Sequence, residues 1–146
     1  MKILVINGPN INMVGIREPD IYGKQDFQAL QDSIRQWAEE LGVEVELYQS
    51  NHEGDLVDAI QKAYFDQIDG IVINPAAYTH TSVAILDALK SVSIPTVEVH
   101  LSDIYSRDKF RQFSYTSLAA EKTIAGEGFD GYRHAMEYLI EQYGNV

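Results

Sequence analysis

The sequence contains no cysteine and no long apolar run. The first absence excludes a disulfide framework, a thiolate nucleophile and a cysteine-ligated metal. The second argues against a membrane span, and the apolar run at the N-terminus, residues 3–6, is too short for a signal peptide. We therefore expect a cytoplasmic protein.

Positive charge is also scarce. The chain has 11 Lys and Arg against 22 Asp and Glu, which gives a formal net charge of −11. A field of that sign repels nucleic acids and anionic membranes, so neither is expected as a partner. An anionic small molecule is still acceptable as a ligand where a few arginines gather in one cleft.

The sequence motifs of cofactor and metal sites are missing. There is no phosphate-binding loop with Lys-Ser/Thr and no H-E-x-x-H motif, and no lysine is placed as a Schiff base would need. Residues 126–131 match G-x-G-x-x-G, but the chain ends soon afterwards and Glu127 would face the phosphates. We assign these glycines to turns and packing, and we expect neither a metal nor a cofactor.

What the sequence does contain is an alternation of strands and helices. The 146 residues, 45% hydrophobic, suffice for one domain over residues 1–146. Apolar runs bounded by turn residues predict strands over residues 2–7, 43–48, 70–74, 95–100 and 123–126. Helical periodicity predicts helices over residues 26–42, 56–64, 79–92 and 132–143. Asp26 is expected to cap the first helix, Gly42 to end it, and residues 50–53 to form a capping box for the second.

The strands define the fold class. Most are continuously apolar, which is typical of a parallel sheet covered on both faces, whereas residues 43–48 alternate in polarity and favour an edge strand. Five strands in this length predict an α/β fold, a flavodoxin-like doubly wound sandwich. Its five-stranded parallel sheet has the predicted order 2-1-3-4-5.

A long connection separates the first strand from the first helix. Residues 8–24 are predicted to lack regular structure, and a loop of that length in a compact domain is usually functional. It carries Arg17 and Tyr22, and a nearby guanidinium favours the phenolate form of a tyrosine, which is a competent base. We interpret the loop as a lid that carries the base of an enzyme. A tyrosine that only packs the loop, and an arginine solvated beside Glu18 and Asp20, are the alternatives.

Polar side chains gather where the predicted strands end. In a sheet of this kind, ligands bind beyond the carboxyl ends of the strands. Polar side chains follow those ends, at Asn7, Asn10, Asn12, Gln49, Ser50, Asn74, His80, His100 and Ser102. The loops that leave the first and fourth ends add Arg17, Tyr22, Arg107 and Arg111. This convergence predicts a site more strongly than any single residue does.

Glu98 and His100 are two residues apart in a predicted strand, so their side chains share one face. A buried carboxylate needs a partner, and an imidazole held by a carboxylate is suited to act as a general acid. A purely structural ion pair is the equally weighted alternative.

The other candidates also have simpler interpretations. Asn7 and Asn12 are turn formers, Asn74 can simply end a strand, and His80 can assist a helix start. Residues 101–102 can offer backbone amides to a carboxylate or form an ordinary turn. Arg107 and Arg111 would share a face in a helical turn, and either bind an anion or pair with local acids. Asp87 is by itself a surface charge on the third helix.

Several long motifs together resemble type II 3-dehydroquinate dehydratase. They are Asn7-Gly8-Pro9-Asn10, Arg17-Glu18-Pro19-Asp20-Ile21-Tyr22-Gly23, Gln49-Ser50-Asn51-His52-Glu53-Gly54, Asn74-Pro75-Ala76-Ala77-Tyr78-Thr79-His80-Thr81-Ser82 and Glu98-Val99-His100-Leu101-Ser102. The resemblance covers essentially the whole chain. It implies the conversion of 3-dehydroquinate to 3-dehydroshikimate by anti elimination of water through an enol or enolate, without metal, cofactor or Schiff base. The reaction would serve aromatic amino-acid biosynthesis, by the shikimate pathway, or quinate breakdown.

The resemblance also implies a role for individual residues. Tyr22 would be the proton acceptor, and Arg17 and Arg107 would supply the positive field that its phenol needs. Asn10 would hold a water against the developing enolate oxygen, and His100, oriented by Glu98, would protonate the leaving hydroxyl.

Substrate binding and assembly follow from the same resemblance. The matched binding positions are Asn74, His80 and Arg111 for hydroxyl groups, Leu101 and Ser102 for the carboxylate, and Asp87 reached from a neighbouring subunit. The resemblance implies a homo-oligomer, a dodecamer built from trimers.

Two other classes compete with this prediction. A non-catalytic flavodoxin-like module that binds a small molecule is the alternative, although residues 7–10 lack the hydroxyls of a flavin phosphate loop. A phosphoacceptor receiver domain is rejected, because Asn7 and Asn74 stand where it needs acidic residues.

Overall fold

The protein is an alternating α/β chain. The structure, a computed structural model, describes residues 1–16 and 25–144. The strands are β1 (Lys2–Asn7), β2 (Glu44–Gln49), β3 (Gly70–Asn74), β4 (Thr96–His100) and β5 (Lys122–Ala125). The α-helices are α2 (Phe27–Leu41), α3 (Glu53–Phe65), α4 (Val83–Val92) and α5 (Asp130–Tyr143). Short 3₁₀ helices are η1 (Ile11–Met13), η2 (Ala76–His80), η3 (Ile104–Ser106), η4 (Lys109–Arg111) and η5 (Thr116–Leu118).

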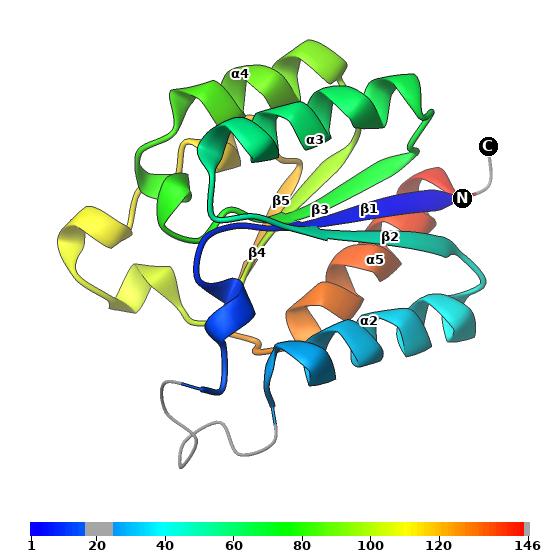
Figure 1. Ribbon diagram of the computed structural model, residues 1–146, viewed down its shortest axis with the longest axis horizontal. Coiled ribbons are helices and arrows are strands. Elements are labelled where there is room, and N and C mark those ends of the chain that lie inside the picture. The colour runs from blue at the N-terminus through cyan, green and yellow to red at the C-terminus, as the bar shows by residue number, and fades with distance from the viewer. Residues whose placement is uncertain (17–24, 145–146) are drawn as a thin grey trace.

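The strands form one parallel sheet in the order β2-β1-β3-β4-β5. Helices α3 and α4 cover one face of the sheet, and α2 and α5 cover the other (Figure 1). The predicted flavodoxin-like fold and strand order are confirmed. Strand β2 lies at an edge and alternates between exposed and half-buried residues, as its sequence predicts, whereas β3 and β4 are buried throughout.

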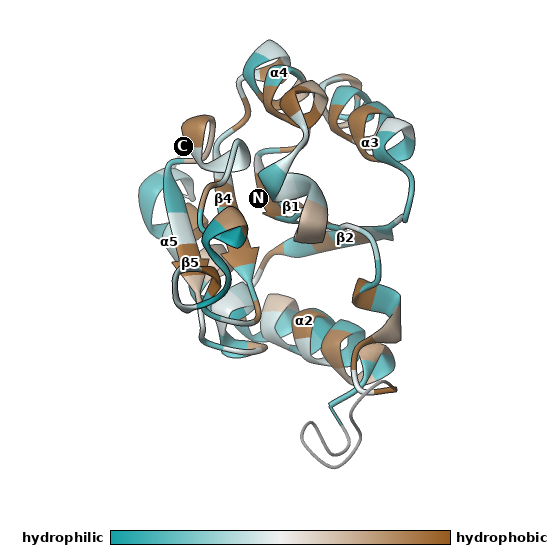
Figure 2. Cartoon of the chain, turned by 90° about the vertical axis from the view of Figure 1, so that its left-hand side faces the viewer, coloured by the Kyte–Doolittle hydropathy of each residue, from teal (hydrophilic) through white to brown (hydrophobic). Residues whose placement is uncertain are grey.

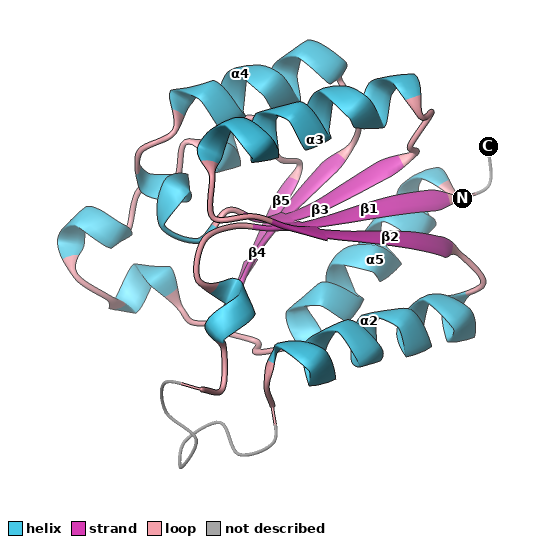
Figure 3. Ribbon diagram, viewed as in Figure 1, coloured by secondary structure: helices cyan, strands magenta, loops and turns pink. Residues whose placement is uncertain are grey.

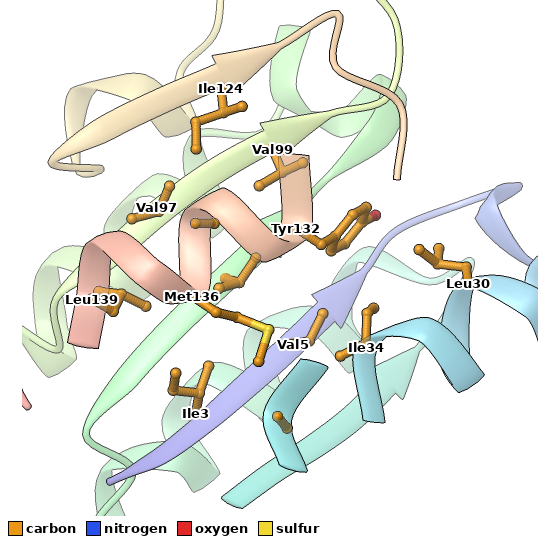
Figure 4. Close-up of a cluster of buried hydrophobic side chains, with 13 residues drawn as sticks. Ile3, Val5, Leu30, Ile34, Val97, Val99, Ile124, Tyr132, Met136 and Leu139 are labelled. Carbon is orange, nitrogen blue, oxygen red and sulfur yellow. The ribbon is translucent and has the colours of Figure 1, made fainter. Parts of the chain in front are cut away.

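Two hydrophobic cores lie on the two faces of the sheet, because successive residues of a strand point to opposite sides. In β1, Ile3 and Val5 join the core under α2 and α5, whereas Leu4 and Ile6 join the core under α3 and α4. Figure 4 shows the first core, in which Met136 and Leu139 of α5 pack over the strands. The helices are banded in hydrophobic and hydrophilic residues, as amphipathic helices should be (Figure 2).

The predicted ends of the first helix are confirmed. Asp26 is the N-cap of α2, and its Oδ1 accepts a hydrogen bond of 2.8 Å from the backbone N–H of Ala29. Gly42 follows the helix at φ 72°, a left-handed conformation that favours glycine.

Other helix starts differ from the prediction. The capping box at residues 50–53 is wrong, because α3 begins after His52 and the hydroxyl of Ser50 bonds the His52 N–H and Asp55 instead. The third predicted helix is two elements, since η2 ends at His80 and α4 starts only at Val83, with Ser82 as its cap.

The two long irregular segments contain short turns of helix (Figure 3). Residues 11–13 form η1, so the connection after β1 is not wholly without regular structure. Residues 101–118, between the fourth and fifth predicted strands, contain η3, η4 and η5. Both segments leave carboxyl ends of strands, on the left in Figure 1.

No helix within the described residues is both long enough and apolar enough to cross a membrane.

Replacing Met136 by alanine should lower the free energy of unfolding by about 2–5 kcal/mol, because its side chain is fully buried and would leave a cavity. Chemical denaturation measures the change. The matched control is Glu141→Ala on the exposed side of the same helix, which should change stability by no more than about 0.5 kcal/mol. Equal losses in the two variants would contradict the assigned core.

Candidate active site

A cleft of about 330 Å³ opens where three neighbouring strands end. A cleft of this volume is at the lower end of the range for small-molecule sites. Its lining residues come from the segments that follow β1, β3 and β4, and they are Pro9, Asn10, Ile11, Asn74, Ala76, Ala77, His80, His100, Leu101, Ser102, Ile104, Arg107 and Arg111. The predicted convergence of polar residues on one rim is therefore confirmed for most of its members.

Register explains why these residues meet. Asn7, the last residue of β1, is paired with Asn74, the last residue of β3, and β3 is in turn paired with β4, which ends at His100. Because parallel strands end on the same edge of a sheet, each strand delivers one polar side chain and then a loop to that edge.

The Glu98–His100 pair forms as predicted. His100 Nε2 bonds Glu98 Oε2, and both side chains are buried, Glu98 fully and His100 to 5% exposure. Because Nε2 is occupied by the carboxylate, Nδ1 is the ring nitrogen left for a ligand. The carboxylate thus fixes the orientation of the ring, so that Nδ1 is presented to the cleft.

Hydroxyl groups that the sequence analysis did not single out surround Glu98. Ser114 Oγ lies 2.9 Å and 2.8 Å from the two carboxylate oxygens, and Thr79 Oγ1 lies 3.2 Å from Oε2. Thr123 of β5 makes a longer contact of 3.5 Å. The signal that could have found them is the burial of Glu98 itself, since a buried carboxylate must have donors.

His80 is held in one orientation by the loop after β4. Its Nδ1 lies 2.8 Å from the backbone oxygen of Phe113, so Nδ1 carries the proton and donates it. In the neutral ring, Nε2 is then an acceptor for a hydroxyl group. The simpler interpretation of His80, that it assists the start of a helix, does not hold, because His80 is the last residue of η2.

Asn74 belongs to a buried chain of hydrogen bonds. Tyr132 on α5 donates to Asn7 Oδ1 over 2.5 Å and accepts from Asn74 Nδ2 over 3.0 Å, while Asn74 Oδ1 accepts from the Ala76 N–H. These contacts fix the amide so that its remaining N–H is free for a ligand. Burial raises the pKa of Tyr132 well above that of an ordinary phenol, although its bond with Asn74 opposes the shift, so Tyr132 remains protonated.

Asn10 adopts a left-handed backbone conformation, φ 70° and ψ −4°, which asparagine tolerates better than most residues. Its N–H donates to Asn51 Oδ1, and Gln49 Nε2 donates to Asn51 Oδ1 and to the Gly8 carbonyl. Polar residues after the edge strand therefore hold the loop that carries Asn10. Their side chains support the cleft without lining it.

The two arginines line the cleft for a reason other than the predicted one. Arg107 follows η3 in an extended conformation, and Arg111 ends η4, so the two arginines share no helical turn. The guanidinium of Arg111 lies 5.0 Å from the Phe110 ring. Its Nε is buried and has no hydrogen-bond partner within the part of the chain that the structure describes.

Backbone donors complete this side of the cleft. Among the described residues, the N–H groups of Leu101 and Ser102 donate to no protein acceptor, while the Leu101 carbonyl is held by the N–H of Gly128. Two free amides beside two arginines form a suitable environment for a carboxylate.

One predicted binding residue lies away from this cleft, and two predicted catalytic residues are not among the described residues. Asp87 is exposed on α4 and does not line it. Arg17 and Tyr22 lie outside the described residues. Within residues 1–16 and 25–144, no three side chains of the metal-binding types are grouped so that they could hold an ion.

Comparison with known proteins decides the family. A model described as Dehydroquinase class II matches residues 1–140. The chain belongs to the class II dehydroquinase family. A 3-dehydroquinate dehydratase of Lachnospira eligens is 53% identical over 142 residues, 97% of each chain. One of Clostridium perfringens is 55% identical over 139 residues, 95% of this chain and 96% of that protein.

A solved structure agrees with the same assignment. The type II dehydroquinase of Butyrivibrio crossotus superposes with a TM-score of 0.91 at 52% identity, covering 95% of this chain and 97% of that one. The dehydroquinase prediction drawn from the sequence motifs is confirmed at the level of the family. The alternative of a non-catalytic binding module is not favoured.

Replacing Tyr132 by phenylalanine should lower the free energy of unfolding by about 1–3 kcal/mol, because Asn7 and Asn74 each lose a buried hydrogen-bond partner. Chemical denaturation again measures the change. The matched control is Tyr138→Phe on the same helix, since the hydroxyl of Tyr138 bonds nothing in the described chain. Equal stability of the two variants would contradict the bridging role.

Proposed function

We propose that this protein catalyses the dehydration of 3-dehydroquinate to 3-dehydroshikimate, with residues 1–146 as one catalytic domain. The observation that carries the proposal is a single cleft that contains a carboxylate-held imidazole, two arginines and two free backbone amides. The family to which the chain belongs, and the relatives named 3-dehydroquinate dehydratase, support it.

The reaction needs an acid and a base but no redox step. The substrate is a cyclic carboxylate with a ketone. A base removes a proton from the carbon next to the ketone, and the electron pair moves onto the ketone oxygen to give an enolate. When the ketone re-forms, the hydroxyl group on the carbon next to the deprotonated one is expelled. It accepts a proton and leaves as water. The product is a conjugated enone.

Tyr22 is the proposed base. An unperturbed phenol titrates near pH 10, so it requires the positive field of Arg17 and Arg107 at neutral pH. The described chain leads toward this segment at Ile16, which lines a hollow that shares Asn10, Ser102 and Arg107 with the cleft. The described part of the predicted lid, residues 8–16, therefore reaches the cleft.

His100 is the proposed acid. Glu98 holds Nε2, so Nδ1 protonates the leaving hydroxyl and Glu98 stabilises the ring before the transfer. Asn10 holds the water that stabilises the enolate oxygen, a charge that develops only during the reaction.

Binding uses the rest of the cleft. The amides of Leu101 and Ser102 bind the substrate carboxylate, and the hydroxyl groups contact Asn74 through its fixed N–H, His80 through Nε2, and Arg111. On a protein with a net charge of −11, these cationic and N–H groups provide the local attraction that an anionic substrate needs.

Asp87 is proposed to reach the substrate from a neighbouring subunit, and its exposure away from the cleft of its own chain supports that role. The proposal includes a dodecamer built from trimers and a cytoplasmic location. It also includes a part in the shikimate pathway or in quinate breakdown.

The activity is tested by ultraviolet absorbance after the purified protein is added to 3-dehydroquinate. Absorbance should rise as the enone forms, and Tyr22→Phe should abolish the rise because it removes the ionisable hydroxyl. The control is Tyr64→Phe, which changes an exposed tyrosine on α3 and should leave the rate unchanged. A folded protein that produces no rise would refute the proposed activity, and full activity of Tyr22→Phe would refute the base.

The shared site is tested by mixing inactive variants. Asp87→Ala and Tyr22→Phe subunits, once exchanged, should recover part of the activity, because some sites then combine an intact Tyr22 with an intact Asp87 from the neighbour. A mixture of Tyr22→Phe and His100→Ala is the control and should stay inactive, because both residues belong to the same subunit's site. Absence of recovery after mass spectrometry has verified exchange would contradict the contribution of Asp87.

A further inference from the structure

The hydroxyl groups around Glu98 have no place in the proposed proton transfers, yet they are among the most buried polar groups of the protein. Thr79 is 0% exposed and Ser114 is 4% exposed. They come from two different segments, since Thr79 lies in η2 and Ser114 follows η4. Their shared feature is that both oxygens lie within hydrogen-bond distance of the same carboxylate.

The proton of Ser114 can be assigned from its neighbours. Ser114 Oγ accepts a hydrogen bond from the backbone N–H of Ser117 over 3.2 Å. Its own single proton goes either to Glu98, whose oxygens lie at 2.8 Å and 2.9 Å, or to Thr79 Oγ1, whose proton then goes to Glu98. An ionised carboxylate has only acceptors, so this arrangement fits the charged form of Glu98.

Thr79 reinforces the same donor. Its Oγ1 lies 2.6 Å from Ser114 Oγ and 3.2 Å from Glu98 Oε2. If it donates to Ser114, it polarises the Ser114 O–H, and if it donates to Glu98, it adds a second donor. Both arrangements stabilise negative charge on the carboxylate.

We propose that Ser114, backed by Thr79, is a positioning residue for the general acid: it holds Glu98 as an anion, and the anion keeps the proton on His100. The inference deepens the proposed function and rests on it for the step that uses the proton. Without these donors, a buried carboxylate is stabilised less well as an anion and supports the imidazolium less.

The other titratable side chains near Glu98 and His100 are not substituted in these variants. His80, Arg107 and Arg111 line the same cleft as His100. Tyr105 of η3 is also close enough to sense Glu98, since burial and then the negative charges of Glu98 and Asp103 raise its pKa. None of these side chains is altered by changes at Ser114 or Thr79, so a difference between variants reports on the hydroxyl groups.

The first experiment follows the ring of His100 by NMR in the ligand-free protein, with His100→Ala used to assign its signal. In Ser114→Ala, the midpoint of its titration should move to lower pH by roughly half a unit to one unit, the scale of a lost hydrogen bond to a charged group. Thr79→Val, which keeps the side-chain shape, should move it in the same direction. This measurement does not depend on turnover.

The matched control is Thr116→Val. Thr116 is fully buried two residues from Ser114, and its Oγ1 has no hydrogen-bond partner within the described residues. The variant removes a buried hydroxyl from the same loop without touching Glu98, so the titration of His100 should be unchanged. An equal shift in Thr116→Val would overturn the proposal, because the effect would then come from loop packing.

The second experiment measures kcat for 3-dehydroquinate against pH. In Ser114→Ala the fall in kcat at high pH, where the acid loses its proton, should begin at a pH lower by the same roughly half to one unit. The rise at low pH, which belongs to the base, should not move. A purely structural role would instead lower kcat by one factor at all pH values.

The outcomes separate the two proposals. A shifted His100 titration in a protein whose unmutated form does not turn over 3-dehydroquinate would refute the proposed function and leave the role of Ser114 in place. Folded Ser114→Ala and Thr79→Val proteins with an unchanged His100 titration would overturn the role of Ser114, whatever their activity. If Ser114→Ala does not fold, Thr79→Val alone decides.

Discussion

A carboxylate buried behind His100 sets the requirements for the residues around it. Water does not reach Glu98, so the protein must supply the donors that water would have supplied. It does so with an imidazole on the same strand and with hydroxyl groups from η2 and from the loop after η4. Through these hydrogen bonds, the segments that follow β3 and β4 contact each other at the carboxyl edge of the sheet.

Further hydrogen bonds between these two segments position the remaining site residues. The N–H of Tyr115 donates to the carbonyl of Thr79 over 2.8 Å, and His80 donates to the carbonyl of Phe113. The segment after β4 that satisfies the carboxylate therefore also fixes the second imidazole, and the same segment carries both arginines. The contacts that satisfy the buried carboxylate therefore also shape the cleft.

Local sequence signals were sufficient for the fold and for much of the site. Polarity patterns predicted the five strands, and the order of the sheet followed from their alternation with helices. Once the strands are known, parallel pairing brings Asn74 and His100 to one edge without any knowledge of side-chain contacts. The pairing of Glu98 with His100 was predictable because both lie on one strand, two residues apart.

Contacts between distant segments could not be predicted in that way. Ser114 and Thr79 meet Glu98 across 16 and 19 residues, and nothing in their own sequence distinguishes them from ordinary loop hydroxyls. The capping box failed because the Ser50 hydroxyl found a nearer partner in the His52 N–H. The shared helical turn of the arginines failed because the backbone extends between them.

The tyrosine that bridges the ends of β1 and β3 has a consequence for how the site comes into being. Its hydroxyl bonds a residue 125 positions earlier in the chain, and it sits near the start of the last helix. During synthesis, the strands and the first three α-helices leave the ribosome before that hydroxyl does. Until the last helix docks, the two asparagine amides lack their shared partner. The protein therefore gains a correctly oriented binding edge only after nearly the whole chain has been made.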